Sequence, residues 1–120
     1  MDQFNFEKLE VYKKALSFTD KIYLLTKDFP ADEKFNLTSQ LKRAAISIAV
    51  NIAEGSASTK KDFNRFLTIA SGSVKEIVVC ITIAQRQSLI SQKIEIEIRD
   101  DLVEISKMIS GLKKYLNKQK

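Results

Sequence analysis

The hydrophobic positions of this chain recur every three or four residues along four long segments. Such a period places apolar side chains on one face of an α-helix. Short polar stretches separate the segments, and short connections make neighbouring helices antiparallel. The pattern predicts an all-α, up-and-down antiparallel four-helix bundle, with residues 1–120 as a single domain. The predicted helices cover about residues 7–27, 37–54, 60–87 and 92–116.

Several residues indicate where these helices begin and end. Asn5 is the expected N-cap of the first helix, because its side chain can accept from a free backbone N–H. Thr59 with Asp62 three residues later resembles a capping box at the third helix. Gly55 follows the second helix, where glycine adopts a left-handed C-cap without strain. Gly72, inside the third helix, is expected to mark a close contact between helices.

Residues 77–83 are rich in β-branched side chains and by composition suit a strand. The helical stripe passes through them without interruption, and no turn residue isolates them, so we predict helix. The whole chain has only 3 Gly and 1 Pro, which is too few turn residues for a many-stranded fold.

The most apolar stretch, residues 40–55, carries three polar residues in awkward places, namely Arg43, Asn51 and Glu54. They could form a site, or they could anchor the second helix to its neighbour. We favour structural anchors, because a buried polar residue often fixes the register of packed helices.

The residue types restrict the chemistry. There is no histidine, which removes imidazole catalysis and most zinc sites. Cys80 is the single cysteine and lies among Ile and Val, so we expect a core residue and a reducing, cytoplasmic setting. The sequence shows no phosphate-binding glycine loop and no nucleophile elbow. We therefore expect no enzymatic activity, no cofactor and no metal.

The N-terminal residues MDQFNFEKLE have early charges and no apolar core, unlike a signal peptide. The longest uncharged apolar run, residues 44–53, is about half of what a membrane span needs. We expect no membrane contact.

Charge is divided unequally between the two ends of the predicted bundle. Residues 1–19, 45–74 and 105–120 hold 11 basic and 5 acidic residues, a balance of +6, whereas residues 20–40 and 85–104 hold 6 and 9, a balance of −3. A positive end could neutralise phosphates. Solvated surface lysines that favour the helix dipole are the plainer alternative. The candidate nucleic-acid-binding residues are Lys60, Lys61, Arg65, Lys113, Lys114 and Lys118.

The helices carry more apolar residues than one bundle can cover. Large exposed apolar patches usually mark an interface, so we expect a homo-oligomer. The surplus residues are Ile69, Val78, Val79, Ile83, Ile96 and Val103.

Three segments of the chain, FEKLEVYKKA, DFPADEKFNLTSQLKRAAISIAVNIAEG and KKDFNRFLTIASGSVKE, occur in that order. Together they resemble the 23S ribosomal RNA intervening-sequence protein family over about residues 4–116. The most specific matches are Gln40, Arg43, Ala44, Ser47, Asn51, Ile52, Ala53, Glu54 and Gly55, followed by Phe63, Phe66, Ala70, Gly72, Ser73 and Glu76. The resemblance implies an up-and-down four-helix bundle that assembles as a homopentamer. Some members of the family that the chain resembles are encoded inside ribosomal RNA genes, and some related proteins bind nucleic acid.

Two functions remain open at this stage. The first is a non-enzymatic oligomer that binds RNA or DNA through its basic end. The second is a protein-interaction or structural scaffold with no nucleic-acid binding.

Overall fold

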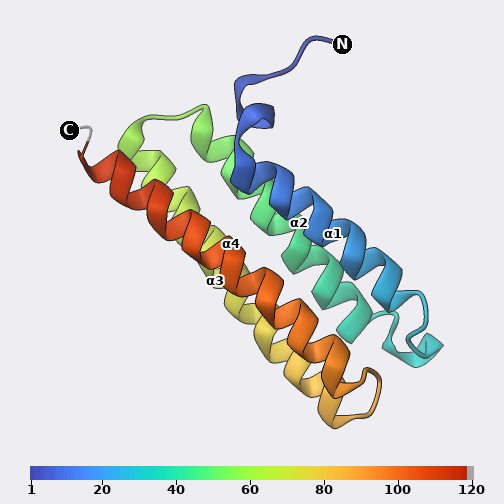
Figure 1. Ribbon diagram of the computed structural model, residues 1–120. Coiled ribbons are helices and arrows are strands. Elements are labelled where there is room, and N and C mark those ends of the chain that lie inside the picture. Colours follow the sequence, from blue (N-terminus) through green and yellow to red (C-terminus); the bar gives the residue numbers. More distant parts are fainter. Residues whose placement is uncertain (119–120) are drawn as a thin grey trace.

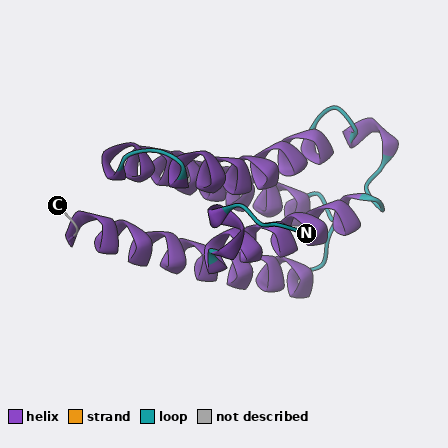
Figure 2. Cartoon of the chain, turned by 90° about the horizontal axis from the view of Figure 1, so that it is seen from above, coloured by secondary structure: helices purple, strands orange, loops and turns teal. Residues whose placement is uncertain are grey.

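Four long helices follow one another with reversed directions in the computed structural model, which describes residues 1–118 (Figure 1). They are α1 (Glu10–Thr26), α2 (Leu37–Ser56), α3 (Lys60–Arg86) and α4 (Gln92–Lys118). Two short 3-10 helices, η1 (Asn5–Lys8) and η2 (Ala31–Glu33), precede α1 and α2. The predicted all-α, up-and-down bundle is confirmed, and residues 1–118 contain no strand. The body is elongated, 47 × 30 × 21 Å, and its connections are short loops (Figure 2).

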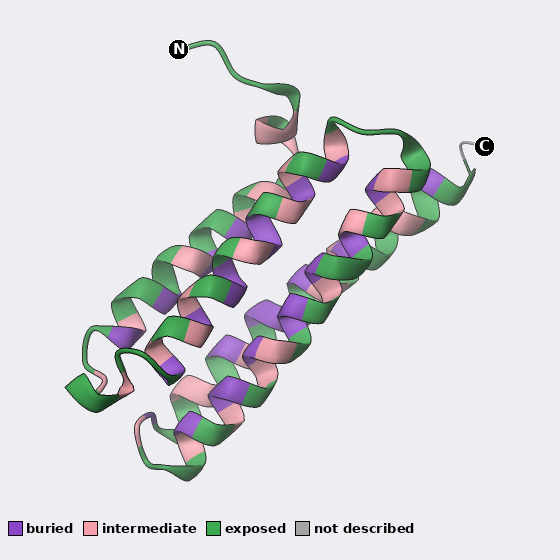
Figure 3. Cartoon of the chain, turned by 180° about the vertical axis from the view of Figure 1, so that it is seen from behind, coloured by how far each residue is buried: buried purple, intermediate pink, exposed green. Residues whose placement is uncertain are grey.

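The core lies along the inward faces of all four helices, where the buried residues form stripes (Figure 3). The pairing of α2 with α3 is the most extensive in the bundle, and that of α1 with α4 the least. Cys80 is 3% exposed and belongs to the core, as expected. The largest completely buried side chains are Phe18, Ile22, Leu41, Ile48, Ile52, Leu67, Ile77, Ile81, Leu102, Ile105 and Ile109.

The β-branched residues 77–83 are helical, inside α3. Tertiary packing of their apolar stripe outweighs their local preference for a strand. By length and composition alone, α3 is also apolar enough to cross a membrane, the one such helix within residues 1–118. A helix in the core of a bundle meets the same criterion, and 39% of the apolar window of α3 is buried against its neighbours.

The start of α1 differs from the prediction. Asn5 does not cap it, because residues 5–8 form η1 and the helix begins at Glu10 after the N-cap Leu9. The ring of Phe6 packs edge-on against Tyr12 at 5.0 Å, which folds η1 back along α1. At α3 the expected cap is present, since the Thr59 hydroxyl accepts from Asp62 N at 3.2 Å.

Both glycine predictions were wrong. Gly55 is buried inside α2, which continues to Ser56, and no glycine among the described residues has a positive φ. A Cβ on Gly55 would lie 2.7 Å from Phe63 Cδ1 and 2.9 Å from Phe66 Cβ. Gly72 is exposed, and its Cβ would meet nothing within 4 Å. The glycine that permits close approach of two helices is therefore Gly55.

A small ion-pair cluster joins α1 to α4, where the helices pack least. Asp101 accepts from Lys14 Nζ at 3.0 Å and from Lys21 Nζ at 2.7 Å, and Glu104 lies 3.2 Å from Lys14 Nζ. Burial of Asp101 alone would raise its pKa, but the hydrogen bonds from Lys21 and Lys14 outweigh this and hold the pKa below its usual range. The hydrogen bond to Asp101 also raises the pKa of Lys14.

This cluster predicts a specific acid sensitivity. A carboxylate whose pKa is depressed by folding stabilises the fold above its unfolded pKa of about 3.9, and this contribution is lost as pH falls through the folded value. We expect Asp101→Asn to lower the free energy of unfolding by about 1–3 kcal/mol at pH 7 and by much less at pH 2. Urea titrations of both proteins at each pH measure the difference. An equal loss at both pH values would contradict the ionic role of Asp101.

Candidate nucleic-acid interface

The predicted basic end exists as one end of the molecule. The start of α1, the α2–α3 turn, the first residues of α3 and the end of α4 lie together there (Figure 1). Lys60 and Lys61 occupy the first turn of α3 beside the last turns of α4. They line a hollow of about 330 Å³ with Asn64, Leu116 and Asn117. Lys120, which entered the charge count, lies outside the described residues.

This hollow is lined by two lysines, two asparagines and the apolar Leu116, without a carboxylate among the residues described. Asn64 Nδ2 donates to Asn117 Oδ1 at 3.3 Å, which connects the start of α3 to the end of α4 across the hollow. Lys118 is exposed at the end of α4. The two lysines of α3 and Lys118 therefore supply positive charge to the same end from two helices.

Arg65 and Lys113 also lie on these turns, but both contact the bundle surface. Arg65 Nε is 3.7 Å from Asp62, and its guanidinium stands 4.6 Å from the centre of the Phe66 ring. Lys113 Nζ donates to Thr68 Oγ1 at 2.7 Å, between α4 and α3. Their charges add to the field of this end, while their side chains are oriented by neighbours.

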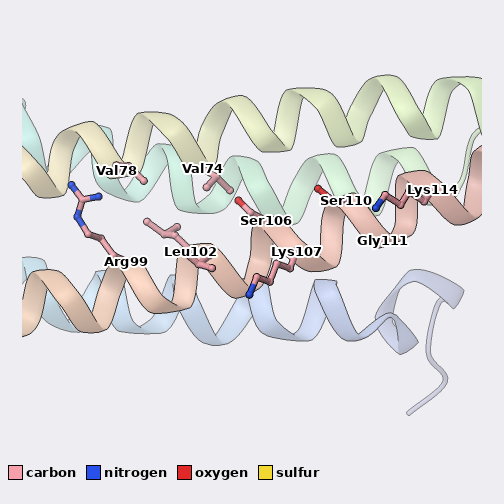
Figure 4. Close-up of a pocket in the computed structure, with 10 residues that line it drawn as sticks. Val74, Val78, Arg99, Leu102, Ser106, Lys107, Ser110, Gly111 and Lys114 are labelled. Atoms are coloured by element: carbon pink, nitrogen blue, oxygen red, sulfur yellow. The ribbon is translucent and has the colours of Figure 1, made fainter.

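Lys114 points elsewhere. It lines a groove between α3 and α4 together with Lys107 and Arg99, farther along α4 (Figure 4). Lys107 and Arg99 were not among the candidate residues predicted from the sequence. The signal was present, because residues 107 and 114 are seven apart and thus share a helix face. The spacing within α4 does not show that α3 lies beside the face that holds Lys107 and Lys114.

Two of the predicted polar anchors connect α2 with α3. Arg43 Nη2 forms an ion pair with Glu76 Oε1 at 3.0 Å. Asn51 Nδ2 donates to the carbonyl and hydroxyl oxygens of Ser47, at 2.8 and 3.0 Å. The Ser73 hydroxyl donates to the same Ser47 Oγ at 2.9 Å, so Asn51 acts on α3 through Ser47. This arrangement favours the structural interpretation.

Glu54 differs, because its side chain is exposed. Its backbone carbonyl accepts from Ala57 N and from the Ser58 hydroxyl in the α2–α3 turn, at 3.3 and 3.0 Å. The anchoring group at this position is therefore the main chain, which any residue type supplies.

Two further observations concern metal ligands and the Cys80 thiol. No group of three or more His, Cys, Asp or Glu within residues 1–118 could hold a metal ion. Burial raises the pKa of the Cys80 thiol, whose Sγ lies 3.8 Å from Gln40 Oε1. A raised thiol pKa disfavours the reactive thiolate.

Apolar side chains remain on the surface of the single chain. Of the six residues predicted to be surplus, Val78 is partly buried in the α3–α4 groove. The other five, which are 42–57% exposed, are Ile69, Val79, Ile83, Ile96 and Val103.

Comparison with known proteins assigns this bundle to a family. The model of the 23S rRNA-intervening sequence protein family matches residues 7–111. The chain belongs to this family. A solved structure of a protein of unknown function from the S23 ribosomal protein family of Bacteroides thetaiotaomicron is similar, with a TM-score of 0.79 and 28% identity. The similarity covers 87% of this chain and 98% of that one. No protein with curated function matches.

Membership in the 23S rRNA-intervening sequence protein family agrees with the resemblance stated from the sequence. The match spans all four helices, from before the start of α1 to Gly111 in α4. It therefore covers the α2–α3 contact at Gly55 and the first turn of α3, but ends before Lys113, Lys114 and Lys118.

Proposed function

We propose that this protein is a non-enzymatic cytoplasmic oligomer that binds RNA through the basic end of its bundle. The observation that supports this most directly is the hollow between the start of α3 and the end of α4. It brings Lys60 and Lys61 beside the amides of Asn64 and Asn117, with no carboxylate among its described lining residues. Such a surface suits a phosphate backbone.

The chemistry of this end favours binding without strong sequence preference. Lysine ammonium groups neutralise phosphates and release counterions, which makes affinity fall steeply with salt. The Asn117 amide N–H groups can donate to phosphate or sugar oxygens, whereas Asn64 Nδ2 already donates to Asn117 Oδ1 and to the Lys60 carbonyl. Phe63 is buried, and Phe66 is covered by Arg65, so neither ring offers a free stacking surface for a base.

Oligomerisation is the second part of the proposal. A monomer would leave Ile69, Val79, Ile83 and Ile96 exposed to water, and burial of apolar surface stabilises by about 25 cal/mol per Å². The homopentamer implied by the family resemblance is the assembly that we propose. A ring of identical bundles would also repeat the basic end several times on one particle and raise the effective affinity for a long RNA.

A salt series tests both parts. We expect fluorescence anisotropy with a labelled single-stranded RNA to show binding near 50 mM salt, and log K to fall linearly with log salt concentration. Light scattering of the same samples should give a mass several times that of one chain. Absence of binding at the lowest salt would overturn the RNA function, and a monomer mass would overturn the assembly.

The exposed apolar residues also favour the second candidate, a protein-interaction or structural scaffold. That function predicts an oligomer with no affinity for RNA or DNA at any salt concentration. The anisotropy measurement separates the two, because both candidates predict the same mass in the absence of RNA.

A further inference from the structure

The groove between α3 and α4 is a second surface with its own chemistry. It has a volume of about 450 Å³ and lies along the side of the bundle (Figure 4). Val74 and Val78 of α3 and Leu102 and Val103 of α4 form its apolar part. Its polar lining comes from α4, in the order Arg99, Ser106, Lys107, Ser110 and Lys114.

The charges of this groove are all of one sign. None of its lining residues is acidic. Arg99 is held in place, because Nη2 donates to Thr82 Oγ1 at 2.7 Å and Nε lies 3.2 Å from Glu95 Oε2. Within residues 1–118, Lys107 and Lys114 have no ion-pair partner, so their charges are available to an anion.

The groove surface between Arg99, Lys107 and Lys114 is open, because the residues there have small side chains. Ser106 and Ser110 expose hydroxyl groups that can donate and accept hydrogen bonds. Gly111 leaves free space, since a Cβ there would meet nothing within 4 Å. Between residues 99 and 114 the helix rises about 22 Å, at roughly 1.5 Å per residue. An extended chain with repeated negative charges matches this length and spacing.

Charge argues against the apolar α1–α2 face of a second copy of this chain as the occupant. A hollow between α1 and α2 is lined by Phe6, Tyr12, Leu16, Thr19, Ile46, Ala49, Val50 and Ala53, without a carboxylate. Placing that face on the groove would bury Lys107 and Lys114 without a counter-charge, which is unfavourable. A polyanion supplies the missing charge.

We propose that the α3–α4 groove holds a single strand of RNA, with phosphates at Lys107 and Lys114 and the sugar edge against the serine hydroxyls. The inference rests on the proposed RNA function and extends it. The strand runs from the basic end along α4 toward Arg99. Valine side chains in place of aromatic rings make this segment indifferent to base identity.

The first test compares salt dependence. We expect Lys107→Gln with Lys114→Gln to reduce the slope of log K against log salt by roughly 1.4, at about 0.7 per phosphate contact for a single strand. Lys27→Gln with Lys93→Gln, two exposed lysines at the other end, should leave the slope unchanged. If wild type binds RNA and the groove variant keeps the wild-type slope, the groove inference is wrong and the basic end stands alone. If wild type does not bind, both proposals fall.

The second test locates the strand directly. Ser110 in the groove and Ser17 on α1 are both exposed. The cysteine of Ser110→Cys or of Ser17→Cys can carry an azidophenacyl group. Cys80 is buried with a raised pKa and should not compete for the reagent. We expect light-induced crosslinks to labelled RNA from position 110 and not from position 17. Equal RNA crosslinking from both positions, or a protein–protein product from position 110 instead of RNA, would overturn the inference.

Discussion

Replacing Gly55 by alanine is expected to lower the free energy of unfolding by about 1–3 kcal/mol, the usual range for overpacking a core. The new methyl group would lie 2.7 Å from Phe63 Cδ1 and 2.9 Å from Phe66 Cβ. The ring of Phe63 can turn away, but Phe66 Cβ moves only with the backbone of α3. The α2–α3 contact, the most extensive in the bundle, would therefore have to open.

Gly72→Ala is the matched control, because it is the same substitution in a neighbouring helix. Position 72 is exposed, and its added Cβ meets nothing within 4 Å. Alanine is favoured over glycine inside a helix by up to about 1 kcal/mol, so this variant should be more stable than wild type. Urea denaturation followed by circular dichroism measures both. Equal effects of the same sign at positions 55 and 72 would contradict close packing at Gly55.

Reversing three charges at the basic end is expected to weaken RNA binding by about 100-fold or more near 50 mM salt. The variant is Lys60→Glu, Lys61→Glu and Lys118→Glu. Each change removes a cation from the end and adds an anion, so lost attraction and new repulsion act together. Glutamates in the first turn of α3 also favour its helix dipole, which preserves the fold. Anisotropy with the labelled single-stranded RNA gives the affinity.

The control variant carries the same change in net charge at the opposite end, through Lys27→Glu, Lys34→Glu and Lys93→Glu. All three lysines are exposed there. We expect it to bind RNA within a few-fold of wild type, because exposed charges beyond about 10 Å are largely screened at 0.1 M salt. Equal losses in the two variants would mean that net charge, and not the basic end, governs binding.

The charge-reversal variant leaves the groove residues unchanged, so the two proposed RNA surfaces can be tested separately. Loss of affinity in that variant with an unchanged salt slope in the groove variant would assign binding to the end alone. Losses in both would support one continuous strand path from the end along α4. Each result therefore bears on one surface independently of the other.

Long-range patterning in the sequence was sufficient for the architecture. The 3.6-residue stripes predicted all four helices, and the second, third and fourth begin where predicted, at Leu37, Lys60 and Gln92. The core residue Cys80 and the exposure of Ile69, Val79, Ile83, Ile96 and Val103 also followed from these stripes. A helix repeats the same local geometry, so its buried and exposed faces can be worked out from spacing alone.

Local signals at the helix ends were less reliable. Asn5 and Gly55 have the residue types of caps, yet one lies in η1 and the other is buried in α2. In both cases aromatic side chains decided the outcome, Phe6 against Tyr12 at the first and Phe63 with Phe66 at the second. Those contacts join separate elements, which a spacing rule within one helix does not describe.

The division between sequence and tertiary structure is clearest for the charged residues. The chain alone determined that positive charge gathers at one end, because short loops and alternating helix directions dictate which segments meet. Only the folded bundle decided that Asp101 pairs with Lys14 and Lys21, or that Lys114 faces the α3–α4 groove with Lys107. Ion pairs and grooves depend on how neighbouring helices are rotated about their axes. That rotation is set by the packing of their side chains.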